Sequence, residues 1–563
     1  MHVSPVNTHQ PEGQRARFMV IGVGPHAKRT FIKHLRVLKD EGKGELAAAV
    51  DIIPNRESIE SYAETAMLGA ELFFVPMFRE EMPKAVASQL DSAVKRLAID
   101  CAIISTEPEC HKAYGLWAMR LGLHVIMDKP VTTRRDAVTD IKQAAAIMTD
   151  FDELLEAYTE LQTRKETFFL INSHRRYHPG FFGANDMISE IQNKTGCPVT
   201  NIVSTHCDGL WRLPGEIVDQ HYHPFKYGYG KVSHSGYHFL DTTYRFMKAG
   251  WAKGRRPDEI EVVSSFLMPN GFMKATTRKE YQKIFGAGEY DATTGYSDEQ
   301  LTEAMRSMGE YDAMIQFTFK QQGEVIATAH INLLHTGFSR RSWLEHGKNP
   351  AFDDLYKGVG RVKHEAHEVR SGPFQTLVID SRQANDKHDR SKPSTAELGT
   401  DNHFEVQSWR NCSVLGESEP LKVYSVADLD KRYDTTLPGI YSENIKRGIL
   451  WEAIDYLQSK KSLDQMSSNI WDHSVPVAFM SAAYASHVRR SLGLSPVTRI
   501  DLTYASDEPF SHALAALRRQ DLVIPSPRMF PLAIKRIIKS RRLAKLYMQK
   551  IGGAPKEMRK DVI

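Results

Sequence analysis

Over about the first 150 residues, short apolar runs alternate with stretches in which apolar residues recur every three or four positions. Residues 18–23 have the length of a buried strand, and Phe31, Leu35 and Leu38 after them have the spacing of one helical face. The order strand, helix, strand then repeats to about residue 130. Strands that alternate with helices predict a parallel, doubly wound sheet, so the chain is expected to begin with an α/β domain.

The pattern changes after a helical stretch at residues 136–166. Six strand-like runs follow with few helices between them, which predicts an α+β domain with an open, mainly antiparallel sheet. The runs are VTNIVSTHCD, EIEVVSSFL, DAMIQFTFK, EVIATAHINLLH, FQTLVIDS and HFEVQSW. Long inserts, which are usually functional or disordered, interrupt them at about 209–232, 268–311, 336–371 and 383–400. Two helices are expected over 439–492.

The chain therefore divides into four expected parts. These are a disordered lead over residues 1–15, the α/β domain over 16–150, a second domain over 151–500 and a basic extension over 501–563. From residue 528 onward, eleven Lys or Arg against two acids give +9, which leaves −5 for the remainder of a chain whose net charge is +4. A nucleic-acid-binding function is not expected from this distribution.

Composition argues against several other protein classes. No run approaches the ~18 apolar residues that a membrane span needs. The polar N-terminus lacks the apolar core of a secretory signal. The five cysteines have irregular spacing and no CxxC pair, which disfavours a disulfide framework or a zinc site. We expect a cytoplasmic protein without a membrane span.

The first candidate motif, Gly22-Val23-Gly24-Pro25-His26-Ala27, follows the first strand and opens a helix. Gly22 permits the tight turn, Gly24 lets a pyrophosphate approach the backbone, and Ala27 keeps helix and strand close together. The helix N-terminus would face the phosphates. The motif predicts a Rossmann-type dinucleotide site, with Pro25 and His26 among its cofactor contacts.

The second strand ends in Asp51, which lies 27 residues beyond Gly24. A carboxylate at this place accepts hydrogen bonds from a ribose diol, so the sequence favours NAD as cofactor. Arg56 is close enough in sequence to meet a 2′-phosphate, which leaves NADP possible.

The second motif is carried by DCAIISTEPECHKAYGLWAMRLGLHVIMDKP, with Thr106, Pro108 and His111 followed by the trio Asp128-Lys129-Pro130. This arrangement resembles the Gfo/Idh/MocA oxidoreductases, in which one strand ends in Thr-Pro-like residues and the next in Glu-Lys-Pro. The resemblance implies that these residues contact the cofactor, and that Lys129 also reaches the reacting hydroxyl. A cation held by a carboxylate suits that task, because it stabilises a developing alkoxide.

The third motif is GYGKVSHSGYHFLDTTYRF, in which His238 and Asp241 match the last two positions of the family pattern. The usual acid of that pattern is replaced by His234, so the sequence departs from the family here. On a helix, spacings of four and three would place the three side chains on one face. We expect catalytic roles for all three, with His238 as general base because imidazole titrates near neutral pH. Two histidines on a core helix are the alternative.

Two further groups are candidates for substrate binding. In NSHRRYHP, family members often carry an arginine beside the cleft; Arg176 is the closer match, and Tyr177 and His178 adjoin it. A salt bridge at the rim is the alternative. The insert WRLPGEIVDQHYHPFKYGYGK adds His221 and His223 among aromatic residues. These fit an aromatic, sugar-stacking loop better than a metal site, and no metal is expected.

The resemblance implies reversible hydride transfer between nicotinamide and a secondary hydroxyl of a carbohydrate or polyol. It also implies that the second domain binds the substrate and forms a homodimer or homotetramer. A redox-neutral, NAD-dependent glycosidase or lyase and a non-catalytic dinucleotide-binding regulator remain open as alternatives. In the extension, FPLAIKRIIKSRRLAKLYMQK is expected to dock on the acidic body or a second subunit rather than on a membrane.

Overall fold

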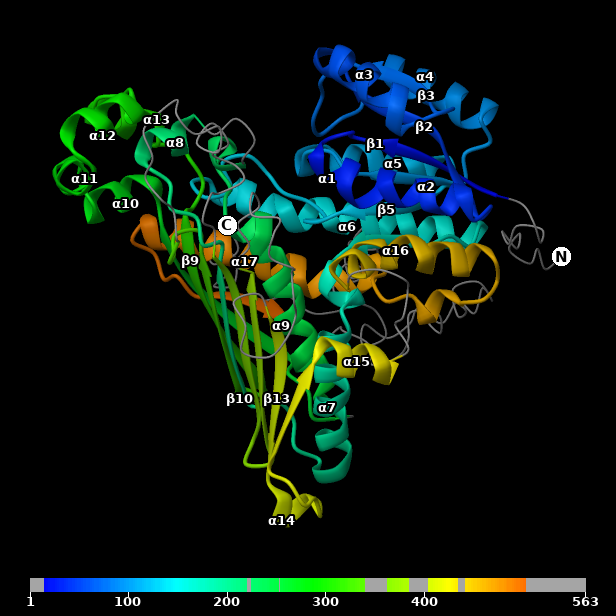
Figure 1. Ribbon diagram of the computed structural model, residues 1–563. Coiled ribbons are helices and arrows are strands. Elements are labelled where there is room, and N and C mark those ends of the chain that lie inside the picture. Colours follow the sequence, from blue (N-terminus) through cyan, green and yellow to red (C-terminus); the bar gives the residue numbers. More distant parts are fainter. Residues whose placement is uncertain are drawn as a thin grey trace, which may run out of the picture.

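The computed structural model describes residues 15–219, 224–252, 254–339, 362–383, 403–433 and 441–502. The expected disordered lead apart from its last residue, most of the polar insert at 383–400, and the basic extension beyond residue 502 lie outside the described residues. The described chain forms two sheets with their helices, and Figure 1 shows the first domain in blue and cyan beside the larger second domain.

The first domain contains a six-stranded parallel sheet in the order β3-β2-β1-β4-β5-β6. Its strands are β1 (Ala16–Ile21), β2 (Gly44–Ile52), β3 (Glu71–Val75), β4 (Cys101–Ile104), β5 (His124–Asp128) and β6 (Phe169–Asn172). The strand order reverses between β1 and β4, and ligands of doubly wound sheets bind at such a switch point, beyond the carboxyl ends of the strands.

The helices of the first domain cover both faces of this sheet. They are α1 (Pro25–Ala27), which continues through the π-helical turn Lys28–Ile32 into α2 (Lys33–Asp40), then α3 (Arg56–Ala66), α4 (Lys84–Arg96), α5 (His111–Arg120) and α6 (Ile141–Arg164). The expected boundary near residue 150 falls inside α6, and β6 joins the first sheet after it.

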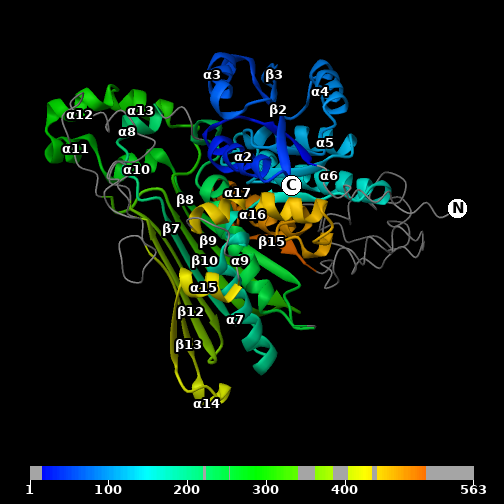
Figure 2. The ribbon, with the colours of Figure 1, turned by 45° about the vertical axis from the view of Figure 1, so that its right-hand side comes forward.

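The core of the first domain also includes a helix from near the other end of the described chain. Ile449, Leu450 and Ile454 of α16 (Tyr441–Leu457) belong to the same buried cluster as Phe18 and Phe31. Figures 1 and 2 both show α16, in gold, lying against the blue domain. The first domain is therefore completed by residues that lie hundreds of positions downstream.

The second domain contains a nine-stranded sheet in the order β14-β13-β12-β11-β7-β10-β9-β8-β15. Its strands are β7 (Asn201–Cys207), β8 (Glu259–Leu267), β9 (Asp312–Gln321), β10 (Glu324–Leu334), β11 (Lys363–Ser371), β12 (Gln375–Gln383), β13 (Phe404–Arg410), β14 (Leu421–Ser425) and β15 (Thr498–Asp501). All described pairings are antiparallel except β7 with β10. The predicted fold class is confirmed for both domains.

One face of the second sheet is packed against helices. The helices α7 (Pro179–Thr195), α9 (Tyr237–Ala249) and α17 (Ser474–Ser491) cover it, as Figure 2 shows. Along β9, Ala313, Ile315 and Phe317 are buried whereas Met314 and Gln316 are exposed. This alternation is typical of a sheet with one face in the core and one face open.

All six strand-like runs predicted from the sequence are strands, but β11, β14 and β15 were missed. In β11, two of the buried positions are the polar residues Glu365 and His367. Arg175 forms an ion pair with Glu365, and His367 lies 2.8 Å from Ser204 Oγ. Because partners in other elements satisfy these inward-facing groups, the strand carries no hydrophobic alternation that a sequence pattern could reveal.

The insert at 268–311 consists mainly of short helices and is not disordered. It forms α10 (Pro269–Ala275), α11 (Arg278–Phe285), α12 (Ala287–Thr294) and α13 (Asp298–Ala304), which gather near α8 (Pro214–Val218) at the upper left of Figure 1. Leu301, Met305 and Tyr311 pack with Ile217 and Phe225 in a small separate core. α15 (Val426–Tyr433) and the four-residue helix α14 (Cys412–Leu415) complete the α-helices of the described residues.

Candidate active site

A cleft of about 360 Å³ opens at the carboxyl ends of β1, β2, β4 and β5, where the first domain meets residues 227–234 of the second. It lies at the switch point of the parallel sheet, as expected for a doubly wound fold. Residues predicted from the sequence that line it are Gly22, Gly24, Pro25, His26, Asp51, Thr106, Pro108, Asp128, Lys129, Pro130 and His234. The cleft thus brings together most of the predicted cofactor residues.

The glycine turn has the geometry that a dinucleotide site needs. Gly22 has φ +88°, and a Cβ there would lie 2.5 Å from the carbonyl oxygen of Ser105. A Cβ on Gly24 would meet no described atom within 4 Å, so this backbone faces open space on the cleft side. Lys28 N donates to Gly24 O (3.0 Å), which starts the helical run to Asp40. The turn therefore fits a bound pyrophosphate.

Asp51 lines the cleft, and its carboxylate is already tied to the protein. It accepts hydrogen bonds from Val23 N (2.7 Å), Ile52 N (2.8 Å) and the Asn55 side chain (2.8 Å). Each carboxylate oxygen has two acceptor sites, so capacity for a ribose hydroxyl remains. Arg56, by contrast, lies over the Phe74 ring at 4.3 Å. It does not line the cleft within the described residues.

Asp128 ends β5, and Lys129 and Pro130 follow it; all three line the cleft, and the Lys129–Pro130 peptide bond is cis. The amine of Lys129 donates to the backbone carbonyl of His234 (2.7 Å), and its backbone N–H donates to Asp128 Oδ1 (2.9 Å). Burial lowers the pKa of the Lys129 amine, and the nearby Asp128 opposes the shift. A lysine in such surroundings exchanges a proton more readily near neutral pH than a solvated lysine.

His111 does not line the cleft within the described residues and instead joins two of its loops. Its Nδ1 lies 3.0 Å from the carbonyl oxygen of Pro130, and its Nε2 lies 3.1 Å from that of Thr106. Burial lowers the pKa of this imidazole. His111 thus holds the loops that follow β4 and β5 in register behind the cofactor cleft.

His234, His238 and Asp241 are separated by an irregularity that the sequence did not reveal. Residues Val232–Gly236 form a π-helical turn, η6, before α9 begins at Tyr237. The inserted residue of a π turn breaks the i, i+4 alignment, and such turns are frequent at functional sites. Of the three side chains, His234 lines the cleft, whereas His238 and Asp241 do not within the described residues.

His238 lies in a column of three imidazoles that starts at the glycine turn. His26 stacks on His174 with ring centroids 5.8 Å apart, and His174 stacks on His238 at 5.6 Å. His26 Nε2 also lies 3.3 Å from Asp128. Burial lowers the pKa of all three histidines. His174 was missed in the sequence because its neighbours in space come from distant segments.

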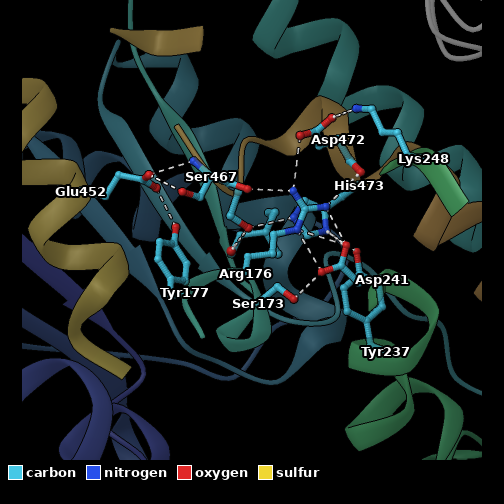
Figure 3. Close-up of polar contacts among 12 residues, drawn as sticks. Ser173, Arg176, Tyr177, Tyr237, Asp241, Lys248, Glu452, Ser467, Asp472 and His473 are labelled. Carbon is cyan, nitrogen blue, oxygen red and sulfur yellow. Dashed lines mark hydrogen bonds and ion pairs between the residues drawn. The ribbon is translucent and has the colours of Figure 1, made fainter. Parts of the chain in front are cut away.

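Arg176 and Asp241 meet in a buried ion pair away from the cleft. Both side chains are 1% exposed and lie 2.6 Å apart, and Ser173 Oγ also donates to Asp241 at 2.6 Å. Asp472 accepts a longer contact from Arg176 (3.4 Å) and binds Lys248 at 2.8 Å. Figure 3 shows this network, which joins the segment after β6 to α9. A salt bridge of Arg176 was the alternative stated from the sequence, but it was expected at the rim of the cleft and is found in the interior.

Tyr177 and His178 also make internal contacts. The Tyr177 hydroxyl donates to Glu452 (2.8 Å), as Figure 3 shows, and His178 Nδ1 accepts from Gly180 N (3.0 Å) at the start of α7. Neither lines the cleft within the described residues. His221 and His223 lie outside the described residues. Within the described part of the chain, no cluster of His, Cys, Asp or Glu could hold a metal ion.

Arg135 and Glu109 were not predicted as cleft residues, because they meet the aromatic loop only where three separate segments of the chain come together. Arg135 forms an ion pair with Glu109 (2.9 Å) and lies over the ring of Tyr227 at 4.3 Å. Tyr229 donates to the same carboxylate at 3.4 Å. These contacts join the first domain to the aromatic loop of the second. The aromatic composition of that loop was its signal in the sequence.

Residues 16–150 match the family model described as "Oxidoreductase family, NAD-binding Rossmann fold". The matched model is that of the Gfo/Idh/MocA oxidoreductases. The cofactor of the Gfo/Idh/MocA domain is NAD, in agreement with the expectation from Asp51. No match was found among curated proteins.

A solved structure extends the likeness in fold beyond residues 16–150. An oxidoreductase domain protein from Kribbella flavida is 11% identical, with a TM-score of 0.52 over 86% of this chain and 99% of its own. Aldose-aldose oxidoreductase from Caulobacter crescentus, complexed with glycerol, is 14% identical, with a TM-score of 0.48 over 87% and 100%. The WlbA dehydrogenase from Bordetella pertussis, in complex with NADH and UDP-GlcNAcA, is 12% identical, with a TM-score of 0.47 over 87% and 99%. At these identities the likeness concerns the fold alone.

No helix in the described ranges is long and apolar enough to cross a membrane.

Proposed function

We propose that the protein is an NAD-dependent dehydrogenase that moves a hydride between nicotinamide and a secondary hydroxyl of a sugar, glycoside or polyol. The observation that carries the proposal is the position of the Lys129 amine. It lines the cofactor cleft, it is held by the His234 carbonyl at 2.7 Å, and burial lowers its pKa. When bound, NAD supplies the hydride acceptor or donor.

Lys129 has the chemistry for both halves of the proton transfer. As a neutral amine it accepts the proton of the substrate hydroxyl, and as an ammonium group it stabilises the alkoxide formed in the reverse direction. An ammonium group has three donors, and the His234 carbonyl takes one of them. The other two remain for the reacting oxygen and a second substrate group.

His234 replaces the usual family acid with a neutral group. Burial lowers the pKa of its imidazole well below the ordinary value, and Lys129 adds to this shift. In the cleft the imidazole would orient a substrate hydroxyl through a hydrogen bond. The role of His238 as general base stays a prediction. His238 is only 7% exposed and lies in the imidazole column behind the cleft, so it does not face the substrate site directly.

The aromatic loop supports a polyhydroxylated ring or chain as substrate. Tyr227 and Tyr229 line the same cleft as Lys129. Aromatic faces bind the apolar side of a sugar ring, and the polar groups around them bind its hydroxyls. Arg135 and Lys226 both lie over the ring of Tyr227, at 4.3 Å and 5.1 Å from its centre, and add positive charge beside this part of the cleft.

The proposal is tested by two linked measurements on the purified full chain. Mass spectrometry of the released cofactor should identify NAD, and a panel of sugars, glycosides and polyols should be followed through NADH absorbance. We expect at least one compound of this class to reduce NAD in a Lys129-dependent manner. Turnover of a glycoside without net NADH formation would replace the dehydrogenase with the redox-neutral alternative. NAD binding without turnover of any compound would favour the regulator.

A further inference from the structure

A buried glutamate–tyrosine pair lies behind the wall of the cleft, outside the set of residues used so far. Glu310, just before β9, and Tyr484, on α17, are each 0% exposed. The Tyr484 hydroxyl donates to Glu310 Oε1 at 2.9 Å. Among the described residues, Glu310 makes no ion pair, and the amine of the nearby Lys231 binds Asp208 instead.

The pair binds the backbone at the start of the π-helical turn η6. Glu310 Oε1 accepts from Val232 N (2.7 Å), and the Glu310 carbonyl accepts from Lys231 N (3.1 Å). The Tyr484 oxygen accepts from Gly230 N (3.4 Å) and from Ser233 N (3.3 Å). Four consecutive backbone N–H groups therefore donate hydrogen bonds to two residues from distant elements.

The first N–H groups of a helix have no partners within the helix and need acceptors from elsewhere. A capping side chain close in sequence can supply one of these acceptors. No side-chain cap precedes η6. Glu310 and Tyr484 supply the missing acceptors, and a carboxyl group at this end is also favoured by the helix dipole.

The anchored turn carries the group that holds Lys129. Ser233 Oγ lies 2.7 Å from the Tyr484 oxygen, and the next residue, His234, accepts from the Lys129 amine through its carbonyl at 2.7 Å. Ser233 and His234 both line the cleft. A displacement of the turn would therefore move the acceptor that fixes the amine.

We propose that Glu310 and Tyr484 are positioning residues, which anchor the turn η6 so that the His234 carbonyl holds the Lys129 amine in its reactive place. This inference rests on the proposed role of Lys129 in hydride transfer. A displacement of about 1 Å can cost a large factor in rate even when the altered group lies far from the chemistry. Burial raises the pKa of Glu310 to about 7, and an amide in its place would keep the oxygen that accepts from Val232 N.

The test compares Tyr484→Phe and Glu310→Gln with two matched variants in the NAD-loaded full chain. Tyr158→Phe removes a buried hydroxyl that donates to Thr167 O (2.7 Å), and Glu452→Gln alters a buried carboxylate that also accepts from a tyrosine. Acetic anhydride labelling of Lys129, read by mass spectrometry, reports on the amine without requiring turnover. Thermal unfolding reports separately on stability.

We expect Tyr484→Phe to label Lys129 about tenfold faster and to lower kcat about tenfold, with the KM for NAD unchanged, because the turn loses two acceptor contacts. Glu310→Gln should stay near wild type, because its amide oxygen still accepts from Val232 N. Tyr158→Phe and Glu452→Gln should alter thermal stability but leave Lys129 labelling unchanged.

The outcomes separate the two proposals. Unchanged labelling of Lys129 in Tyr484→Phe overturns the positioning role, whatever happens to the melting temperature. Equal changes in labelling for Tyr484→Phe and Tyr158→Phe also overturn it, because the effect would then be a general loosening. Faster labelling together with a fully active Lys129→Ala variant would leave the anchor in place and reject the proposed function.

Discussion

Lys129 and Arg176 are both cations near the junction of the two domains, and they differ in what surrounds them. Arg176 faces the carboxylate of Asp241 at 2.6 Å and also contacts Asp472, so that its pKa is raised despite burial. Lys129 faces a backbone carbonyl on one side and the cleft on the other, and burial lowers its pKa. A cation satisfied by carboxylates holds structure together, whereas a cation left with spare donors in a cleft is available for chemistry.

The largest expected effect is loss of stability on Arg176→Ala. Removing one partner of a buried pair leaves the Asp241 carboxylate uncompensated and should lower the free energy of unfolding by about 3–5 kcal/mol. Denaturant unfolding measures this loss. The comparison breaks if the variant keeps its stability but loses turnover, because Arg176 would then serve the substrate. Asp241→Asn provides the same test from the other side.

Lys129→Ala, in contrast to Arg176→Ala, should reduce activity and leave stability unchanged. We expect kcat to fall by about 10² or more, as for loss of a charge-stabilising group, while the fold and NAD binding are kept. Steady-state kinetics and cofactor fluorescence measure the two properties. Lys129→Arg serves as a control, because it keeps the charge but holds its proton at any accessible pH. Near wild-type turnover of Lys129→Ala would show that the cleft cation is not the reactive group.

His234→Asp asks whether an added carboxylate shifts Lys129 toward the behaviour of Arg176. An anion beside the amine favours the ammonium form and should move the acidic limb of the kcat/KM profile about one unit to higher pH. At a fixed pH below that limb the rate should fall about tenfold. A profile identical to wild type would show that the departure from the family acid at this position is incidental.

Asp51 lies in the cleft like Lys129, although protein donors already occupy part of its carboxylate. Repulsion of a 2′-phosphate by Asp51 should make NAD bind about tenfold more tightly than NADP. Asp51→Asn should reduce this difference between the two dissociation constants. Dissociation constants measured at moderate salt check both statements. Arg56→Ala is the matched control and should leave NADP binding unchanged, since Arg56 lies on Phe74. Weaker NADP binding in that variant would instead implicate Arg56 in 2′-phosphate contact.

Glu310 is a third case, a buried ionisable group without a charged partner among the described residues. Its pKa is raised by burial to about 7, while in the unfolded chain it ionises near its ordinary value of 4.5. Between these values the folded protein keeps a proton that the unfolded chain releases, so its contribution to the free energy of unfolding decreases as pH rises. Glu310→Gln should flatten this part of the stability profile, which denaturant titrations at about pH 5 and pH 8 would measure. An unchanged slope of the free energy of unfolding against pH would show that a group other than Glu310 ionises in this range.

The sequence predicted the parts of the site that lie in continuous motifs. The glycine turn, Asp51 and the Asp128-Lys129-Pro130 trio lie at or directly after the carboxyl ends of strands, so their place at one edge of the sheet follows from strand order alone. The relation of His234 to His238 could not be predicted, because the π-helical turn between them shifts the helical phase. Arg135, Glu109 and Tyr229 come from separate segments, and their meeting depends on how two domains pack. The sequence pattern did not predict strand β11, because buried polar side chains take the place of apolar ones on its inner face.

The packing of α16 against the first domain has a consequence for how the chain acquires its structure during synthesis. Domains generally fold as units, with the N-terminal one first. Here Ile449, Leu450 and Ile454 belong to the cluster that includes Phe18 and Phe31. The nascent first domain therefore leaves the ribosome with an uncovered apolar surface, and it acquires its last layer only when residues beyond 440 have emerged. The residues that line the NAD cleft, by contrast, all lie between Ile21 and His234, so they are synthesised before the helix that covers their domain.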